Sequence, residues 1–174
     1  MIGAVAPAKD SGIVDVGGGA SLLVDQLLDR GYDDLIVADI SEAALHVARA
    51  RLGDRGDRVT WQVADARYLR LTQPVDVWHD RAVFHFLTEE ADRQAYLDSL
   101  RQALRVGGHV VVVATFGPGG PDRCSGLPVE RYDAVKLSEV LGPEFELVRS
   151  LQMQHVTPSG ATQEFIYAVY QRLE

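Results

Sequence analysis

Apolar and polar positions change period along this chain in a way that predicts strands and helices in alternation. Residues 13–16 (Ile-Val-Asp-Val) form a short β-branched run typical of a buried strand. After a glycine run, a helix is predicted from Ser21, and the residues expected on its apolar face are Leu22, Leu23, Leu27 and Leu28. Gly31 ends that helix, residues 34–39 form a second buried strand, and Ser41 is the N-cap of a helix that runs to about Leu52. This order is a βαβ unit, whose strands are parallel.

The rest of the chain continues the same architecture and closes it differently. The further elements predicted are strands at 59–65, 75–80 and 109–116, and helices at 88–105 and 133–141. Two last strands, 144–156 and 163–172, are joined by a turn at Pro158-Ser159-Gly160, so the chain ends in a hairpin. Residues 1–12 are predicted to be a short flexible leader, and 13–174 a single domain. The stretch from Gly117 to Pro128 is a long Gly/Pro-rich loop without apolar period.

Three consecutive glycines stand between the first strand and the first helix. Gly17, Gly18 and Gly19 let the backbone approach a ligand closely, and the following helix start offers unpaired N–H groups. The alternative is a tight turn without a ligand. The dinucleotide pattern G-x-G-x-x-G would need a glycine at position 22, where Leu22 stands. The spacing therefore argues against a dinucleotide oxidoreductase.

Three strands end on an aspartate. Asp39, Asp65 and Asp80 each close a predicted parallel strand, and the carboxyl ends of such strands meet at one edge of the sheet. We therefore expect the three carboxylates to face one crevice. The alternative is turn chemistry, because an aspartate after a strand commonly caps the next helix.

Composition limits the class of partner. The 174 residues carry a formal net charge of −8, which argues against a nucleic-acid or anionic-membrane partner and favours a small molecule or a protein. One cysteine permits no internal disulfide, no segment approaches the roughly 20 apolar residues of a membrane span, and no signal peptide is visible at the N-terminus. Cytoplasmic residence is the default expectation.

An ordered set of motifs resembles the class I S-adenosylmethionine (SAM)-dependent methyltransferases over nearly the whole chain. The matching segments are Val-Asp-Val-Gly-Gly-Gly (14–19), Val-Ala-Asp-Ile-Ser (37–41), Val-Ala-Asp-Ala (63–66), Val-Asp-Val-Trp-His-Asp-Arg (75–81) and Leu-Arg-Val-Gly-Gly-His-Val (104–110). The resemblance implies an α/β Rossmann-like, doubly wound sheet of order 3-2-1-4-5-7-6 with strand 7 antiparallel. It also implies SAM as the cofactor, S-adenosylhomocysteine as the product, and no metal.

The same resemblance assigns roles to individual residues. Gly17 and Gly19 would pass under the methionine part, Asp15 would lie near its amino group, and Asp80 would end its strand beside the methyl donor. Asp39 would accept both ribose hydroxyls, while Asp65 and the Ala66 N–H would hold the adenine. The full cofactor-binding set implied in this way is Asp15, Gly17, Gly18, Gly19, Asp39, Ile40, Asp65, Ala66 and Asp80.

The segment 79–87 is similar to small bacterial methyltransferases related to the thiopurine and tellurite-resistance types. In that branch a Cys-Ser-Gly-Leu-Pro stretch also follows strand five, as residues 124–128 do here. Such enzymes carry a helical, aromatic N-terminal segment that closes over cofactor and substrate. Only twelve residues precede Ile13, so we expect the chain to lack this lid and to turn over slowly.

Four residues are candidates for the chemistry: Asp80, Arg81, His85 and Cys124. His85 would serve as a base near neutral pH, with packing between its two phenylalanine neighbours as the alternative. Arg81 would hold the cofactor carboxylate or an anionic substrate, or else pair with Asp80. Cys124 would bind a soft substrate atom if its pKa were lowered, and is otherwise inert.

Three functions are consistent with these residues. The first is methyl transfer to a small-molecule nucleophile, with a thiol, a selenol or a metalloid as candidate acceptors. The second is protein lysine methylation on the same fold, although the Asn/Asp-Pro-Pro-Tyr stretch of many such enzymes is absent after strand four. The third is SAM binding without catalysis, for want of a lid.

Overall fold

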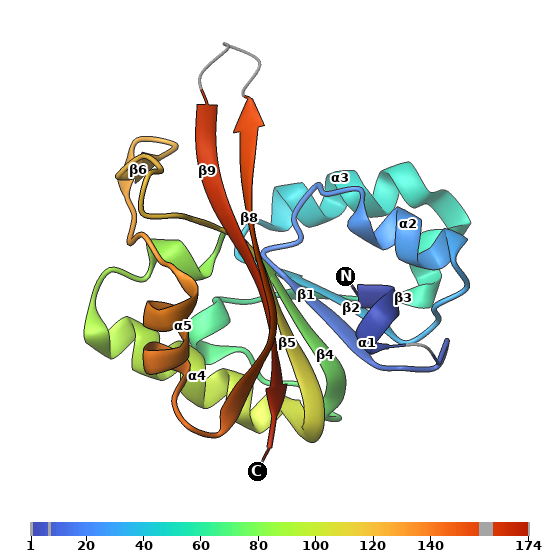
Figure 1. The fold of residues 1–174 in the computed structure, drawn as a ribbon. Helices are drawn as coiled ribbons and strands as arrows, with labels where there is room; N and C mark the ends of the chain where they lie inside the picture. The colour runs from blue at the N-terminus through green and yellow to red at the C-terminus, as the bar shows by residue number, and fades with distance from the viewer. Residues whose placement is uncertain (1, 7, 157–161, 174) are drawn as a thin grey trace.

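A seven-stranded sheet runs through the centre of the molecule (Figure 1) in the computed structural model, which describes residues 2–6, 8–156 and 162–173. The order is β3-β2-β1-β4-β5-β9-β8, and β9 is antiparallel to both of its neighbours. This confirms the predicted order, because β8 and β9 are the sixth and seventh strands of this sheet along the chain. Its strands are β1 (Ile13–Val16), β2 (Leu35–Asp39), β3 (Val59–Val63), β4 (Val75–Arg81), β5 (Leu104–Phe116), β8 (Phe145–Val156) and β9 (Thr162–Arg172).

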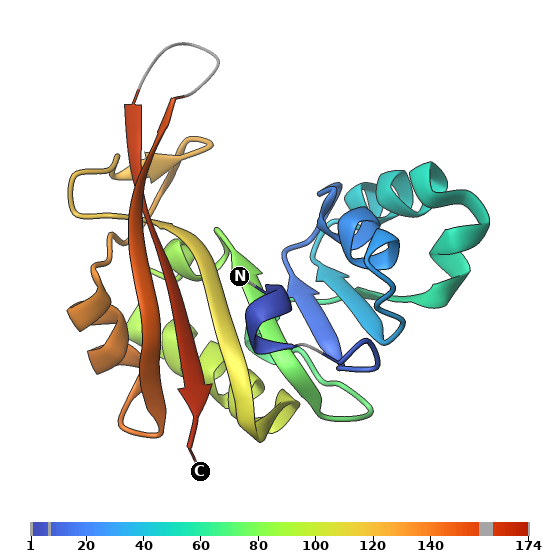
Figure 2. The same ribbon diagram turned by 45° about the vertical axis from the view of Figure 1, so that its right-hand side comes forward.

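Helices cover both faces of the sheet, so the fold has three layers (Figure 2). The layer formed by α2 and α3 lies over the β1, β2 and β3 half, and α4 and α5 lie on the opposite face. The helices are α1 (Ile2–Val5), α2 (Leu23–Asp29), α3 (Glu42–Leu52), α4 (Glu90–Ala103) and α5 (Ala134–Leu141), with 3₁₀ helices η1 (Gly53–Arg58), η2 (Ala66–Tyr68) and η3 (Phe84–Phe86).

The apolar runs of the parallel strands are explained by burial on both faces. Ile13 packs with Leu27 of α2 in one apolar cluster, whereas its neighbour Val14 belongs to the cluster that contains Leu100 of α4. Successive side chains of a strand point to opposite faces, so a covered parallel strand needs apolar residues at consecutive positions. Ser41 caps α3 as predicted, because its Oγ accepts a hydrogen bond from the Ala44 N–H at 3.2 Å.

The boundary between α4 and β5 differs from the prediction. The helix ends at Ala103 and β5 begins at Leu104, not at His109. Leu104 is buried and opposes Val75 in the ladder with β4, where the register then shifts. The helical spacing of the leucines continues through Leu104, so the sequence pattern alone could not show where the helix ends and the strand begins.

Two other segments are more ordered than predicted. The predicted leader contains α1, in which Ile2 is buried, and the Ala6 carbonyl accepts a hydrogen bond from the Tyr32 hydroxyl at 2.6 Å. The Gly117 to Pro128 loop contains a small antiparallel pair, β6 (Arg123–Cys124) and β7 (Leu127–Pro128). Leu22 was expected on the apolar face of the first helix, but it precedes α2 and is exposed.

The predicted turn at Pro158-Ser159-Gly160 lies outside the described residues. Among the helices described, none is long and apolar enough to cross a bilayer.

Candidate functional site

The carboxyl ends of β1 to β4 form the walls of a cavity of about 600 Å³. Of the predicted site residues, those that line it are Gly17, Asp39, Ile40, Asp65, Ala66 and Arg81. Those that do not line it are Asp15, Gly18, Gly19, Asp80, His85 and Cys124. Lining residues that sequence reasoning missed include Arg67, Val83, Phe86, Leu87, Asp92 and Leu127. The volume falls in the range of small-molecule and cofactor sites.

Each glycine of the loop after β1 is required by a different neighbour. A Cβ on Gly17 would lie 2.1 Å from Val83 Cγ2, and Gly17 has a φ of 69°. A Cβ on Gly18 would lie 2.6 Å from Asp15 Oδ2. Gly19 has a φ of 46°, and its Cβ would lie 3.0 Å from Asp39 Oδ2. The loop therefore packs directly on the side chains around the cavity, and any larger residue would displace them.

Asp15 is held beneath this loop by a buried histidine. His79 Nδ1 lies 2.6 Å from Asp15 Oδ1, and both side chains are almost fully buried. Asp15 therefore lies under the glycines, with one carboxylate oxygen already engaged. It was expected near the amino group of the cofactor, and in the structure it is buried and does not line the cavity.

Asp39 presents one carboxylate oxygen to the cavity. Its Oδ1 accepts a hydrogen bond from the Ser41 N–H at 2.7 Å, which fixes the side chain at the end of β2. Its Oδ2 has no hydrogen-bond partner among the described residues. A carboxylate oxygen in this position is suited to accept hydrogen bonds from hydroxyl groups of a ligand.

Asp65 is paired by a residue two positions along the chain. Arg67 donates to both of its oxygens, with Nη2 2.5 Å from Oδ2, and Arg67 also reaches Asp92 Oδ1 of α4 at 2.6 Å. The hydrogen bond from Arg67 lowers the pKa of Asp65, so this carboxyl stays ionised at neutral pH. The part of the cavity where Asp65 and Ala66 are expected to hold the adenine therefore also contains the Arg67 guanidinium and the Asp92 carboxylate. Asp92 lies 25 residues beyond Arg67, and no local pattern indicates their pairing.

Asp80 faces the interior instead of the crevice, which corrects the prediction. It is fully buried; Oδ1 accepts from the Val83 N–H at 2.9 Å, and Oδ2 accepts from the Tyr96 hydroxyl at 2.7 Å. Desolvation raises its pKa to about 6. The chain turns sharply after β4 through Ala82, which has a φ of 64°, and Asp80 caps this turn. Asp80 therefore stabilises the turn after β4, which was the alternative prediction. It could affect a bound cofactor only indirectly, by fixing the shape of this turn.

Arg81 is exposed instead and borders two cavities, and this shared border is called the junction below. It lines the first cavity and also a second one of about 540 Å³, together with Ser21, Gln26 and Tyr167. Among the described residues it has no hydrogen-bond or ion-pair partner, and the carboxylate of Asp80 is satisfied elsewhere. Its guanidinium is therefore available to an anionic group from either side.

His85 is unsuited to act as a base in this structure. It is fully buried, neither ring nitrogen has a partner among the described residues, and its ring packs against Phe86 and Phe116 at centroid distances of 4.5 and 5.1 Å. Burial lowers its pKa to about 4, so the ring is neutral at pH 7. His85 is therefore packed between aromatic rings, which was the alternative prediction, but its second neighbour is Phe116 and not Phe84.

Cys124 lies next to the site but does not line it. It is partly buried on β6, and its ladder partner Leu127 reaches the wall of the first cavity. No group of three His, Cys, Asp or Glu residues able to hold a metal ion occurs in the part of the chain that the structure describes.

Comparisons with known proteins agree with the class that this geometry indicates. A glycine turn, a strand-end carboxylate and an order of 3-2-1-4-5-7-6 are typical of α/β domains that bind a nucleoside-containing cofactor at the strand ends. The model of a family described as a methyltransferase domain matches residues 13–108, more than half of the chain. The chain therefore belongs to this methyltransferase domain family, and SAM is the cofactor of such a domain.

Individual relatives are distant. A SAM-dependent methyltransferase from Methanosarcina mazei superposes with a TM-score of 0.75 at 16% identity, covering 95% of this chain and 94% of its own. The N-methyltransferase NodS from Bradyrhizobium japonicum, in complex with S-adenosylhomocysteine, has a TM-score of 0.72 at 16% identity, covering 94% of this chain and 79% of its own.

A curated relative, EEF1A lysine methyltransferase 2 from Danio rerio, is 25% identical over a 171-residue alignment that covers 93% of this chain. The chain spans 66% of that relative's length.

Proposed function

We propose that this domain transfers the methyl group of SAM to a small-molecule nucleophile that enters through the second cavity. The observation that carries the proposal is the position of Arg81 at the junction of the two cavities. With the ribose at Asp39 and the adenine beside Ala66, the methionine end lies toward Gly17 and Arg81. An acceptor in the second cavity would meet that end. Because SAM supplies an already activated methyl group, the protein contributes mainly alignment of the two reactants.

The residues around the junction favour an acceptor that ionises without help. His79 lines the second cavity, but its Nδ1 is bound to Asp15 and the ring is almost fully buried. His85 lies outside both cavities. Thiols and selenols need no strong base, because a thiol with a pKa near 8.5 is already a few per cent thiolate at pH 7. This supports the soft acceptors predicted from the sequence.

Lysine methylation is the second candidate, and the Danio rerio relative is the observation in its favour. Against it stand the charges beside the junction. The second cavity and the adjoining third one are lined by Arg81 and Arg30 respectively, and none of their described lining residues is Asp or Glu. An approaching ammonium group would be repelled there, whereas a neutral or anionic small molecule would not.

The test is a methyl-transfer assay with SAM and a panel of acceptors, run after SAM binding has been established by calorimetry. The panel holds a thiol, a selenol, an inorganic arsenite or tellurite, and a lysine-containing peptide. Turnover of a small acceptor at a rate well above the peptide supports the proposal. Turnover of the peptide alone would favour lysine methylation, and SAM binding without any transfer would favour a non-catalytic role for this chain.

A further inference from the structure

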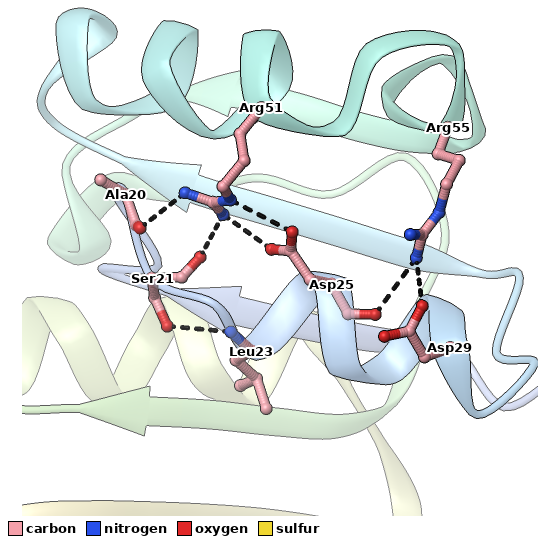
Figure 3. A network of polar contacts seen from close by, with 7 residues as sticks. All are labelled: Ala20, Ser21, Leu23, Asp25, Asp29, Arg51 and Arg55. Atoms are coloured by element: carbon pink, nitrogen blue, oxygen red, sulfur yellow. Dashed lines mark hydrogen bonds and ion pairs between the residues drawn. The ribbon is translucent and has the colours of Figure 1, made fainter.

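One arginine of α3 holds the end of the glycine loop (Figure 3). Arg51 donates from Nη1 to the Ala20 carbonyl at 3.0 Å and from Nη2 to the Ser21 carbonyl at 2.7 Å. It also binds Asp25 of α2 through two nitrogens, at 3.1 and 2.7 Å. These four hydrogen bonds, called the Arg51 network below, join α3 to the glycine loop and to α2, whose bonded residues lie 26 to 31 positions before Arg51.

The start of the loop is held by the sheet, because the N–H groups of Gly17 and Gly18 donate to the Ala38 carbonyl at 2.8 and 3.3 Å. Its glycines carry no side chains, and two of them adopt backbone conformations that an unfolded chain visits freely. The Ser21 hydroxyl is already used, because its Oγ accepts from the Leu23 N–H at 3.1 Å and starts α2. The carbonyls of Ala20 and Ser21 are therefore fixed from outside the loop, and Arg51 supplies the donors.

The same helix also begins at the opposite wall of the cofactor cavity. Ser41, the N-cap of α3, donates its N–H to Asp39, the residue assigned to the ribose. Arg51 lies in the last turn of α3 and reaches residues 20 and 21, which directly follow the glycines assigned to the methionine part and line the second cavity. One rigid helix therefore sets the separation between the two halves of the cofactor site.

We propose that Arg51 is a positioning residue for the methionine part of SAM, acting through the backbone of residues 20 and 21. The inference rests on SAM as the cofactor, and it adds a residue that lies outside the lining of the cavity. Without the network the loop would sample more conformations, and the bound state would pay more ordering entropy. Adenosine lacks the methionine part, so its binding should not depend on Arg51.

The chain supplies a matched control one turn further on. Arg55 of η1 donates to Asp29 Oδ1 at 2.7 Å and to the Asp25 carbonyl at 3.3 Å, and so also binds α2 (Figure 3). It makes no hydrogen bond to the glycine loop. Arg55→Ala therefore removes an arginine that links α2 to η1, the 3₁₀ helix directly after α3, while leaving the loop contacts in place.

The experiment measures the dissociation constants of S-adenosylhomocysteine and of adenosine by calorimetry for the wild type, Arg51→Ala, Arg51→Lys and Arg55→Ala. We expect Arg51→Ala to weaken S-adenosylhomocysteine at least about tenfold, or 1.4 kcal/mol, with adenosine changed less than about twofold. The affinity of Arg51→Lys for S-adenosylhomocysteine should lie between those of the wild type and Arg51→Ala, since a single ammonium group cannot donate to all four acceptor atoms. Arg55→Ala should leave both ligands within about twofold of the wild type.

Equal S-adenosylhomocysteine affinity for Arg51→Ala and Arg55→Ala would overturn the proposal. A parallel loss for both ligands in Arg51→Ala would also overturn it, because that pattern marks a general loss of stability. If Arg51→Ala does not fold, the same comparison is made with Arg51→Lys. Failure of the wild type to bind S-adenosylhomocysteine would instead refute the cofactor assignment, and the role of Arg51 with it.

Discussion

At the carboxyl ends of the strands, the residues on the cofactor side and those on the acceptor side are held in different ways. At the cofactor end, Asp39 is fixed by the Ser41 N–H, and the glycine loop is fixed by Arg51. At the acceptor end, Arg81 has no partner among the described residues, and Met153 of β8, which lines the adjoining third cavity, is exposed. A cofactor that is the same in every turnover is served by a preorganised site. By comparison, the acceptor end is open. A bound acceptor would have to supply the hydrogen-bond or ion-pair partner of Arg81.

The largest effect is expected at the cofactor end, from Asp39→Ala. The substitution removes the carboxylate oxygen available to the ribose hydroxyls and the hydrogen bond from the Ser41 N–H. SAM binding should weaken by roughly 2 to 4 kcal/mol, since charge-assisted hydrogen bonds contribute about 1.5 to 3 each and are not additive. Calorimetry measures the change, with the exposed Asp57→Ala as the control. Unchanged affinity in Asp39→Ala would remove this residue from the site.

The turn between the two ends can be tested through the pH dependence of stability. The pKa of Asp80 is raised from 3.8 to about 6 in the folded state, so the folded protein binds this proton more tightly than the unfolded chain. The contribution of Asp80 to stability is therefore greatest below pH 4 and declines as the pH rises toward 6. At 1.36 kcal/mol per pKa unit the decline is on the order of 3 kcal/mol.

Asp80→Asn cannot titrate, so its destabilisation relative to the wild type should be larger at pH 4 than at pH 7. Urea unfolding of both proteins at the two pH values measures this difference. The difference between the variants isolates Asp80 from carboxyls with lowered pKa, such as Asp65, which lose stability as the pH falls. A destabilisation independent of pH would mean that Asp80 is not desolvated in the native protein.

Arg81→Ala should separate the acceptor end from the cofactor end. We expect methyl transfer to the best small acceptor to fall about tenfold, or 1.4 kcal/mol of transition-state stabilisation. SAM affinity should change by less than about threefold. Arg30→Ala, which removes a cation from the adjoining cavity, is the matched control for net charge. A loss of SAM affinity as large as the loss of rate would place Arg81 on the cofactor carboxylate.

The smallest effect is expected from Cys124→Ser. Because Cys124 does not line the cofactor cavity, SAM affinity should stay within about twofold of the wild type. The role of this thiol toward a soft acceptor is a prediction from the sequence and is tested in the same variant. A tenfold or larger loss of turnover with a thiol or selenol would assign Cys124 to the acceptor, and equal turnover would show that it is inert.

The sequence predicted the parts of the fold that depend on local patterns. The βαβ unit, the Ser41 cap and the terminal hairpin follow from apolar period and turn chemistry within a few residues. It could not distinguish Asp39 from Asp80, because both end a buried strand. Asp80 turns inward because the Tyr96 hydroxyl, sixteen residues later, donates to it.

The same limit applies to the contacts that complete the site. Arg51 reaches the Ala20 carbonyl across 31 residues, and Arg67 reaches Asp92 across 25. Neither pair has a recognisable spacing, since the contact exists only once α3 and α4 are packed on the sheet. Cavity-lining residues next to strand ends, such as Asp39, were therefore predictable, whereas the residues that hold them in place were not.

The central claim, that the strand-end cavity binds SAM, is tested most directly by one pair of calorimetric titrations. Wild-type protein is titrated with S-adenosylhomocysteine and, under the same conditions, with NAD. We expect one S-adenosylhomocysteine bound per chain and no heat of binding for NAD. Binding of NAD without binding of S-adenosylhomocysteine would contradict this claim.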